Sequence, residues 1–381
     1  MYKKQTHRVR NTVLFVLLVI LLVGLGYILS KEWAKRFGPG AQASSEPPAS
    51  MAESSAPPAS SEPVSSEPEA PRVSGKGVAL SAADAAKTGD ELAGLLAGYR
   101  EQGYAFVLLE LKAEDGKVLF DSQNEMARSY GAVSAGAAAL DSLTRAVREA
   151  GLAPVGRISA LKDPLAAHVR NGNSYAYNGD PAINWMDNRA DLGGKPWLNP
   201  YMENARSYIS GLCGEAAERG VEAILLTNVN FPTTPYQSNM GLLNETTIRE
   251  NILLQLMAEC RSAAGDVPVY NSYDAAWAGA SPDNLTPDVG KAARLDSQPL
   301  LAPELDLDAI AANKEAICRQ YAIVDQNGYD PNLPLADVVE GMLHEGPAKD
   351  AGELLPVVRA QDVDSLLPVF EKLEITSYVV E

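Results

Sequence analysis

From Gly77 to the C-terminus, short apolar segments alternate with amphipathic helical segments, and this alternation predicts an α/β fold made of βαβ units. Eight or nine of the apolar segments are candidates for parallel strands, which suits a (β/α)8 TIM-like barrel. The 381-residue chain has room for a barrel of about 250 residues and an appendage. A doubly wound open sheet is the alternative, but no Gly-rich phosphate-binding turn follows the first strand.

The individual elements follow from runs of apolar residues that are bounded by turn residues. The expected strands are, in chain order, Gly77–Leu80, Ala105–Leu111, Val155–Leu161, Ala223–Val229, Val267–Asn271, Leu300–Ala302, Tyr321–Val324, Leu355–Arg359 and Ser377–Val380. The expected helices are Gly89–Gln102, Ser134–Ala150, Asn204–Arg219, Glu245–Ala264 and Gln361–Leu373. Lys117–Phe120 is a candidate hairpin partner of the second strand.

The N-terminal region predicts a membrane anchor. Val13–Leu29 is an uncharged apolar run of 17 residues, about 26 Å long as a helix, which is enough for a single transmembrane helix. Four basic residues precede the run and three follow it, a bias that places the N-terminus inside and the C-terminal domain outside the cytoplasm. A cleaved signal peptide is the rival interpretation, but its small-x-small site, Ala41-Gln42-Ala43, would lie well past the apolar run.

Ala41–Arg72 is a low-complexity segment in which Ser-Ser-Glu-Pro occurs three times. Such a composition cannot bury a core, so we expect a disordered linker that acts as a stalk. The predicted organisation is therefore a cytoplasmic tail and transmembrane anchor over residues 1–40, a linker over 41–72 and a barrel domain over 73–381. The barrel would then function away from the membrane surface.

The composition excludes several classes of site. The net charge of −17 argues against a nucleic-acid partner. Cys213, Cys260 and Cys318 lie far apart in helical segments, so we interpret them as buried thiols on helix faces. The chain has only three His residues, and its cysteines lack metal-ligand spacing, so we expect no metal site and no cofactor.

The fourth expected strand carries polar residues where a barrel keeps its chemistry. In Val221–Pro232 an apolar run leads into Thr227, Asn228 and Asn230, which we expect to face the pocket at the carboxyl end of the strand. Glycoside hydrolysis usually uses two carboxylates around the scissile bond, and none of these three side chains ionises to a carboxylate. The strand therefore places polar residues where a sugar-processing barrel would have its site, but it lacks the catalytic carboxylate.

Several motifs have a recognisable order and spacing. Arg157–Pro164, with the sequence RISALKDP, precedes Trp197-Leu198-Asn199-Pro200-Tyr201, and both precede the fourth strand. Phe106–Lys112 is followed by Asp115-Gly116-Lys117-Val118. This series resembles a bacterial family of membrane-anchored (β/α)8 barrels that are classed as glycoside hydrolases. The resemblance covers roughly Gly77–Pro232. It implies a sugar-processing barrel, and the residues of this chain that match the family's motifs are Lys112, Arg157, Lys162, Asp163, Trp197, Asn199 and Tyr201.

The departures from the family pattern cluster near the expected site. Thr227 stands at the position of the family's strand-four Asp, Asn228 at a Tyr and Asn230 at an Arg. Glu110 replaces an Asp and Leu161 a Phe. These departures leave open whether the chain is an active enzyme or a pseudoenzyme.

Two carboxylates are our catalytic candidates. Asp163 would face the barrel mouth, with Lys162 or Arg157 holding it ionised, or it would cap the helix that starts at Pro164. Asp274 is the best placed of the carboxylates that end a strand candidate. The others are Glu110, Asp187 and Asp325. Glu304, Asp306 and Asp308 alternate with leucines, and we interpret them as a solvated strand or helix start, since no glycine allows a calcium loop.

Aromatic residues in polar loops provide candidates for sugar stacking or, alternatively, for packing on the barrel. They are Tyr175, Tyr177, Trp185, Trp197, Tyr201 and Trp277. The predicted substrate-binding residues are Lys112, Arg157, Lys162, Trp197, Asn199, Tyr201, Asn228, Asn230 and Trp277. The sequence thus predicts a membrane-anchored, extracytoplasmic glycoside-hydrolase-like protein whose partner is a cell-surface or wall polysaccharide. The alternative is an inactive barrel that binds carbohydrate or protein in the envelope.

Overall fold

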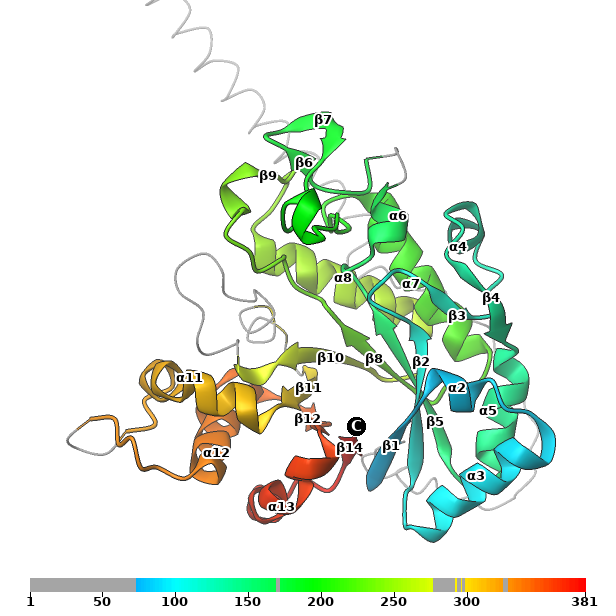
Figure 1. Ribbon diagram of the computed structural model, residues 1–381, viewed down its shortest axis with the longest axis vertical. Coiled ribbons are helices and arrows are strands. Elements are labelled where there is room, and N and C mark those ends of the chain that lie inside the picture. Colours follow the sequence, from blue (N-terminus) through cyan, green and yellow to red (C-terminus); the bar gives the residue numbers. More distant parts are fainter. Residues whose placement is uncertain (1–72, 169–171, 277–291, 293–295, 297–298, 325–327) are drawn as a thin grey trace, which may run out of the picture. The chain divides into compact units, whose positions relative to one another are not determined.

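The computed structural model describes residues 73–168, 172–276, 292, 296, 299–324 and 328–381. Within these residues, eight parallel strands form a closed barrel with helices around it (Figure 1). The barrel strands are β1 (Lys76–Leu80), β2 (Phe106–Lys112), β5 (Ala153–Ser159), β8 (Ala223–Thr227), β10 (Val269–Asp274), β11 (Leu300–Leu305), β13 (Val357–Val358) and β14 (Tyr378–Val380). The predicted (β/α)8 barrel is confirmed.

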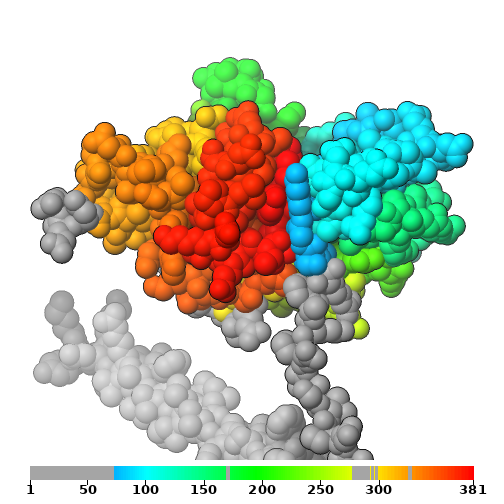
Figure 2. Space-filling model, turned by 90° about the horizontal axis from the view of Figure 1, so that it is seen from below, coloured from blue at the N-terminus to red at the C-terminus, as the bar shows by residue number. Residues whose placement is uncertain are grey.

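The ring closes because β1 pairs in parallel with both β2 and β14. Gly77 is in register with Phe106 on one side and with Val379 on the other. Figure 2 shows the consequence: the first described strand, in blue, lies beside the C-terminal segment, in red. The last residues of the chain therefore complete the barrel, as the strand candidate Ser377–Val380 predicts.

Helices follow the strands along the chain. The longer ones are α3 (Gly89–Glu101), α5 (Leu140–Glu149), α7 (Glu203–Glu218), α8 (Arg249–Ala264), α11 (Leu307–Gln320), α12 (Leu335–Glu345) and α13 (Val363–Lys372). Short helical segments are α2 (Ala82–Ala85), α4 (Glu125–Ser129), α6 (Pro164–His168), η1 (Ala190–Leu192), η2 (Gln237–Asn239), η3 (Pro347–Asp350) and η4 (Ala360–Asp362).

Short strands extend the barrel at two places and form a separate sheet at a third. β3 (Val118–Phe120) pairs antiparallel with β2, as the hairpin prediction requires, and β4 (Val133–Ala138) pairs with β3. β12 (Glu353–Leu354) pairs with β11. The loops after β5 and β8 form a separate three-stranded sheet of β6 (Ala176–Tyr177), β7 (Asp180–Asn184) and β9 (Met240–Gly241).

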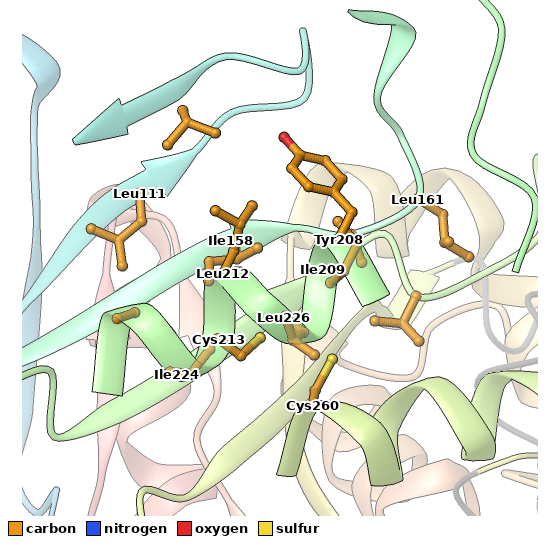
Figure 3. Close-up of a cluster of buried hydrophobic side chains, with 14 of the residues drawn as sticks. Leu111, Ile158, Leu161, Tyr208, Ile209, Leu212, Cys213, Ile224, Leu226 and Cys260 are labelled. Carbon is orange, nitrogen blue, oxygen red and sulfur yellow. The ribbon is translucent and has the colours of Figure 1, made fainter. Parts of the chain in front are cut away.

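Alternation along the strands separates two layers of core. One cluster, including Leu108, Val155, Leu225, Tyr270 and Val379, draws residues from the barrel strands and fills the barrel interior. The residues between them point outward and pack under the helices. Figure 3 shows such a region, where Ile158, Ile224 and Leu226 of the sheet meet side chains of α7 and α8.

The thiols lie where the sequence predicts them, buried on helices. Cys213 of α7 and Cys260 of α8 are both unexposed and lie in the cluster of Figure 3, and Cys318 of α11 is buried as well. A hydrogen bond with Cys213, together with burial, raises the pKa of the Cys260 thiol well above its usual range. These thiols are therefore packing groups.

Two strand predictions need correction. Tyr321–Val324 is not a strand, because Tyr321 ends α11 and its amide donates to Ile317 within the last turn. The strand predicted over Leu300–Ala302 continues to Leu305, so that Glu304 belongs to the barrel.

No helix among the described residues is long and apolar enough to cross a membrane. The predicted anchor Val13–Leu29 and the linker 41–72 lie outside the described residues.

Candidate active site

The carboxyl ends of the barrel strands converge at one opening, which we call the mouth. Residues two apart on a strand share a face, so the inward positions of the interior cluster continue to the strand ends. These inward end positions are Glu110, Arg157, Thr227, Asp274, Glu304 and Glu381. Carboxylates thus line the mouth, where barrel enzymes keep their catalytic groups.

Asp274 of β10 and Glu304 of β11 form a pair of neighbouring carboxylates. Their Cα atoms are partners in the parallel register, which places the two strands about 4.8 Å apart and both side chains on the same face. Ser272 Oγ donates a hydrogen bond of 2.5 Å to Glu304 Oε1. Burial raises the pKa of Glu304, and the charge of Asp274 raises it further. Glu304 therefore retains its proton to higher pH than an ordinary glutamate, whereas Asp274 is exposed at the rim.

Glu110, Arg157 and Glu381 form an ion triad on the neighbouring part of the mouth. Arg157 Nε donates to Glu110 Oε2 over 2.6 Å, and Arg157 also pairs with Glu381. Burial raises the pKa of Glu110, and the charge of Glu381 adds to the rise, so that Arg157 offsets only part of it. The triad presents a cation held between two carboxylates, an arrangement that can orient sugar hydroxyls.

A second, more exposed pair lies on the loops beyond the strands. Lys162 pairs with Glu114, and Asn228 Nδ2 donates to Glu114 Oε1 over 3.1 Å. Burial alone would raise the pKa of Glu114, but the hydrogen bonds from Lys162 and Asn228 lower it overall. Asn230 instead donates from Nδ2 to the carbonyl of Phe231 at 2.9 Å, so its side chain holds the loop after β8.

Asp163 and Lys112 are placed away from the mouth. Lys112 Nζ lies 2.9 Å from Asp163 Oδ2, and both side chains are completely buried. The register of β2 against β5 shifts after Glu110, so Lys112 is paired with Ile158 and shares its outward face. Its Nζ lies 5.9 Å from the ring of Tyr208 on α7. A substrate has no access to either charge in this arrangement.

The contacts of Asp163 match the capping interpretation that the sequence left open. Asp163 Oδ1 accepts a hydrogen bond of 2.8 Å from the amide of Ala166 in the first turn of α6. Gly116 (φ +87°) packs against it, and a Cβ there would lie only 2.3 Å from Asp163 Oδ1. The Asp-Gly turn after β2 and the Lys-Asp-Pro element after β5 are thus two halves of one buried contact.

The Trp197–Tyr201 motif supports the loops from within. Trp197 Nε1 donates to Asp187 Oδ2 at 2.8 Å, and the Trp197 ring lies 6.0 Å from Lys162 Nζ. Asn199 is completely buried and donates to the carbonyl of Leu242. Tyr201 is nearly buried and donates from its hydroxyl to the carbonyl of Thr247 at 2.7 Å. The motif packs beneath the site, although Trp197 borders the Lys162 pair.

The structure brings together some of the predicted site residues and separates others. By strand parity, Arg157, Asp274 and Thr227 all lie on the inward face of the barrel toward the mouth, whereas Lys162 and Asn228 both contact Glu114 on its loops. Glu304 was interpreted as solvated and is instead a mouth residue. The alternation of Ala302 with Glu304 is the signal in the sequence that continues the strand through Pro303 to Leu305. Trp277 and Asp325 lie outside the described residues.

The fold and the mouth define a class, a closed (β/α)8 barrel with carboxylates at the carboxyl ends of its strands. The sequence profile of the family described as "Putative glycosyl hydrolase domain" matches residues 77–280, more than half of the chain. The chain belongs to this family, so its domain is glycosidase-like and its function is carbohydrate-related. The match contains the segment over which the motif resemblance was found. No curated protein sequence matches the chain.

Solved structures similar to this chain include a hypothetical protein from Ruminiclostridium thermocellum, with 18% identity and a TM-score of 0.44, covering 51% of this chain and 96% of that one. An α-galactosidase from Thermus thermophilus has 12% identity and a TM-score of 0.45, covering 81% of this chain and 57% of that one. A cycloisomaltooligosaccharide glucanotransferase from Paenibacillus has 10% identity and a TM-score of 0.45, covering 76% of this chain and 39% of that one. The chain thus spans little more than half of the α-galactosidase.

Proposed function

We propose that the chain is a glycoside hydrolase that cleaves a polysaccharide at the barrel mouth, with Glu304 as general acid and Asp274 as the second carboxylate. The supporting observation is the register of β10 and β11, which sets the two carboxylates side by side on the inward face. The raised pKa of Glu304 suits a proton donor, because a glycosidase acid must stay protonated at working pH.

The roles follow from the environments of the two groups. Glu304 donates its proton to the leaving glycosidic oxygen, which lets the C–O bond break without forming a free alkoxide. Asp274, exposed at the rim, is the second carboxylate, which either attacks the anomeric carbon or activates the water that does so. Arg157, held by Glu110 and Glu381, orients the sugar hydroxyls beside them.

The cellular setting is part of the same proposal. The apolar run Val13–Leu29 would anchor the protein as a single-pass membrane protein, and the Ser/Pro/Glu-rich linker would hold the barrel outside the cytoplasm. The polysaccharide would then be one of the cell surface or wall. The domain boundaries at residues 40 and 72 remain sequence predictions.

Thr227 favours a second candidate function, an inactive barrel that binds glycan. It ends β8 in register with Ser159, and a hydroxyl there can hydrogen-bond a sugar but cannot replace a carboxylate. In the enzyme hypothesis Glu304 and Asp274 take over this role. In the binding hypothesis the same mouth holds a glycan without cleaving it.

The test is the release of reducing ends from a panel of wall and capsular polysaccharides by the full chain in mild detergent. We expect Glu304→Gln and Asp274→Asn each to lower the rate by at least about 100-fold. Glu345→Gln is the matched control, because Glu345 forms an exposed pair with Lys349 at the end of α12. Polysaccharide binding without any hydrolysis by the wild type would favour the binding hypothesis, and full activity in both variants would refute the site.

A further inference from the structure

A cavity of about 360 Å³ lies on the small sheet formed by β6, β7 and β9. This volume falls in the usual range of small-molecule sites, roughly 300 to 1,000 Å³. Its wall includes Tyr177, Ile183 and Tyr236, together with the polar residues Asn188 and Asn239. Tyr177 is 42% exposed and Ile183 is 51% exposed, so the sheet presents an aromatic and an aliphatic side chain to solvent. The cavity has no role in the reaction described above.

The cavity is built on a rigid frame. Asn178 (φ +50°) and Gly179 (φ +80°) form the two-residue turn between β6 and β7, with both φ angles positive as in a type I′ hairpin. β9 packs so closely against this turn that a Cβ on Gly241 would lie 2.7 Å from the Gly179 nitrogen. Tyr177 is in register with Met240 of β9. The backbone that carries the exposed ring of Tyr177 is therefore fixed before any ligand arrives.

The floor of the cavity is fixed as well. Trp185 is only 1% exposed, and its Nε1 donates to the carbonyl of Tyr236 at 3.1 Å. Its ring packs edge-on against Tyr175, with 5.8 Å between the ring centroids. The buried Trp185 thereby joins β7 to the loop that bears Tyr236, and both walls of the cavity are held together.

The lining selects for a neutral ligand that has both apolar and hydroxyl-bearing surfaces. Arg189 borders the cavity, but its Nε and Nη2 donate to both carboxylate oxygens of Asp191 at 2.9 and 2.8 Å. The remaining polar wall includes the amides of Asn188 and Asn239, which match hydroxyl groups. An exposed tyrosine ring stacks on the apolar C–H face of a sugar ring. A neutral sugar unit fits this combination.

Contacts connect the cavity to the mouth. Asp187, adjacent to Asn188 in the cavity wall, accepts the hydrogen bond from Trp197. Trp197 lies beside Lys162, which pairs with Glu114 on the loops of the mouth. The loops after β5 and β8 therefore carry both places on the same side of the barrel. Packed and hydrogen-bonded side chains of these loops therefore hold the cavity in a fixed position relative to the mouth.

We propose that this cavity is a second glycan-binding site, which holds a neutral sugar unit of the polysaccharide away from the hydrolysed bond. The ligand class rests on the proposed function, while the site itself is separate from the catalytic carboxylates. Tyr177 supplies the stacking face, and Asn188 and Asn239 supply hydrogen bonds. The site binds an extended chain more tightly than the mouth alone, because two contacts on one chain reinforce each other.

The experiment measures the Kd of cellohexaose, maltohexaose and N-acetylchitohexaose by calorimetry, using the full chain in mild detergent with Glu304→Gln to prevent hydrolysis. We expect Tyr177→Ala to weaken the binding of at least one hexasaccharide about fivefold, which corresponds to about 1 kcal/mol. Tyr177→Phe keeps the ring and should bind within about twofold of the parent. Leu192→Ala is the control, because Leu192 is 62% exposed in the adjacent η1 and does not line the cavity.

Three outcomes overturn the proposal. They are no binding of any hexasaccharide by the parent, equal Kd values for the parent and Tyr177→Ala, and equal weakening by Tyr177→Ala and Leu192→Ala. A site for an apolar protein partner would give one of the first two. If the wild type hydrolyses no polysaccharide while Tyr177→Ala still weakens hexasaccharide binding, the proposed function fails and the second site stands.

Discussion

Asp163→Asn removes the charge from a buried ion pair while leaving an oxygen to cap α6. Lys112 Nζ lies 2.9 Å from Asp163 Oδ2, and neither side chain is exposed. The carbonyl of Ser159, at 2.6 Å, remains as an acceptor for Lys112 but carries no full charge. The substitution therefore strands an ammonium group in the interior between the sheet and α7, where hydration cannot replace the lost carboxylate.

The expected loss of stability in Asp163→Asn follows from the burial of the ion pair. Loss of one partner of a buried ion pair costs about 3–5 kcal/mol of unfolding free energy. For a domain of this size, with an unfolding entropy of about 0.65 kcal/mol/K, each kcal/mol shifts the melting temperature by about 1.5 °C, so Asp163→Asn should lower it by about 5–8 °C. The double variant Lys112→Met with Asp163→Asn should be less destabilised than Asp163→Asn alone, because no unpaired charge remains.

Thermal unfolding of the full chain in detergent, followed by tryptophan fluorescence, measures these shifts. Lys162→Met is the matched control, since the neighbouring Lys162–Glu114 pair has side chains that are 37% and 57% exposed. An exposed pair contributes at most about 1 kcal/mol, so the control should shift the melting temperature by no more than about 2 °C. Equal shifts for Asp163→Asn and Lys162→Met would refute the reasoning from burial.

Three further predictions concern the mouth and the topology. Burial raises the pKa of Glu304, so the folded state loses stability as the pH rises from the unfolded pKa through the raised folded pKa. Glu304→Gln cannot ionise, so it should melt above the wild type at about pH 8 and level with it at about pH 3.5; no difference at pH 8 would contradict the shift. Thr227→Asp should fold and change the rate of hydrolysis by less than about tenfold, because Glu304 and Asp274 already supply the carboxylate pair; a larger gain would contradict the assignment of that pair. Protease added to intact, wall-stripped cells should remove residues 73–381, and a fully protected domain would contradict the predicted topology.

The barrel could be predicted from the sequence because each βαβ unit leaves a local pattern. The apolar runs of β2, β5 and β8 are bounded by turn residues, and their separation by helices indicates parallel pairing. The short strands near the C-terminus are harder to predict from the sequence than these longer ones. Tyr321–Val324 has a strand-like composition but ends α11, because its apolar side chains pack against the helices around it.

The chemistry of the mouth could be predicted only in part, because it depends on register. Lys112 has the parity of an inward residue, but the irregularity after Glu110 turns it outward to Asp163. Glu304 has the parity of an inward residue and keeps it, since β11 runs through Pro303. Neither a bulge nor a proline in a strand determines by itself whether the next side chains point into or out of the barrel. The pairing with the neighbouring strands determines that direction, and this pairing depends on the whole closed barrel.

The departures at Asn228 and Asn230 have a physical explanation in the structure. Asn228 adopts φ +54° and donates to Glu114 and Ser159, so it links three loops of the mouth. Asn230 holds the carbonyl of Phe231. These residues keep the loops together, while ionisable groups lie on β10 and β11, the next two strands of the barrel after β8. The mouth therefore still has carboxylates, although strand four carries Thr227 at the position of the family's Asp.

The measurement that tests the central claim most directly compares two leaving groups in wild type and Glu304→Gln. Once the panel identifies a hydrolysed sugar, kcat/KM is measured for its oligosaccharide and for its 2,4-dinitrophenyl glycoside. A dinitrophenolate leaves without a proton, whereas a sugar alkoxide needs one from the general acid. We predict that Glu304→Gln loses at least about 100-fold on the oligosaccharide and less than about tenfold on the dinitrophenyl glycoside. Equal losses on both substrates would contradict the assignment of Glu304 as the proton donor.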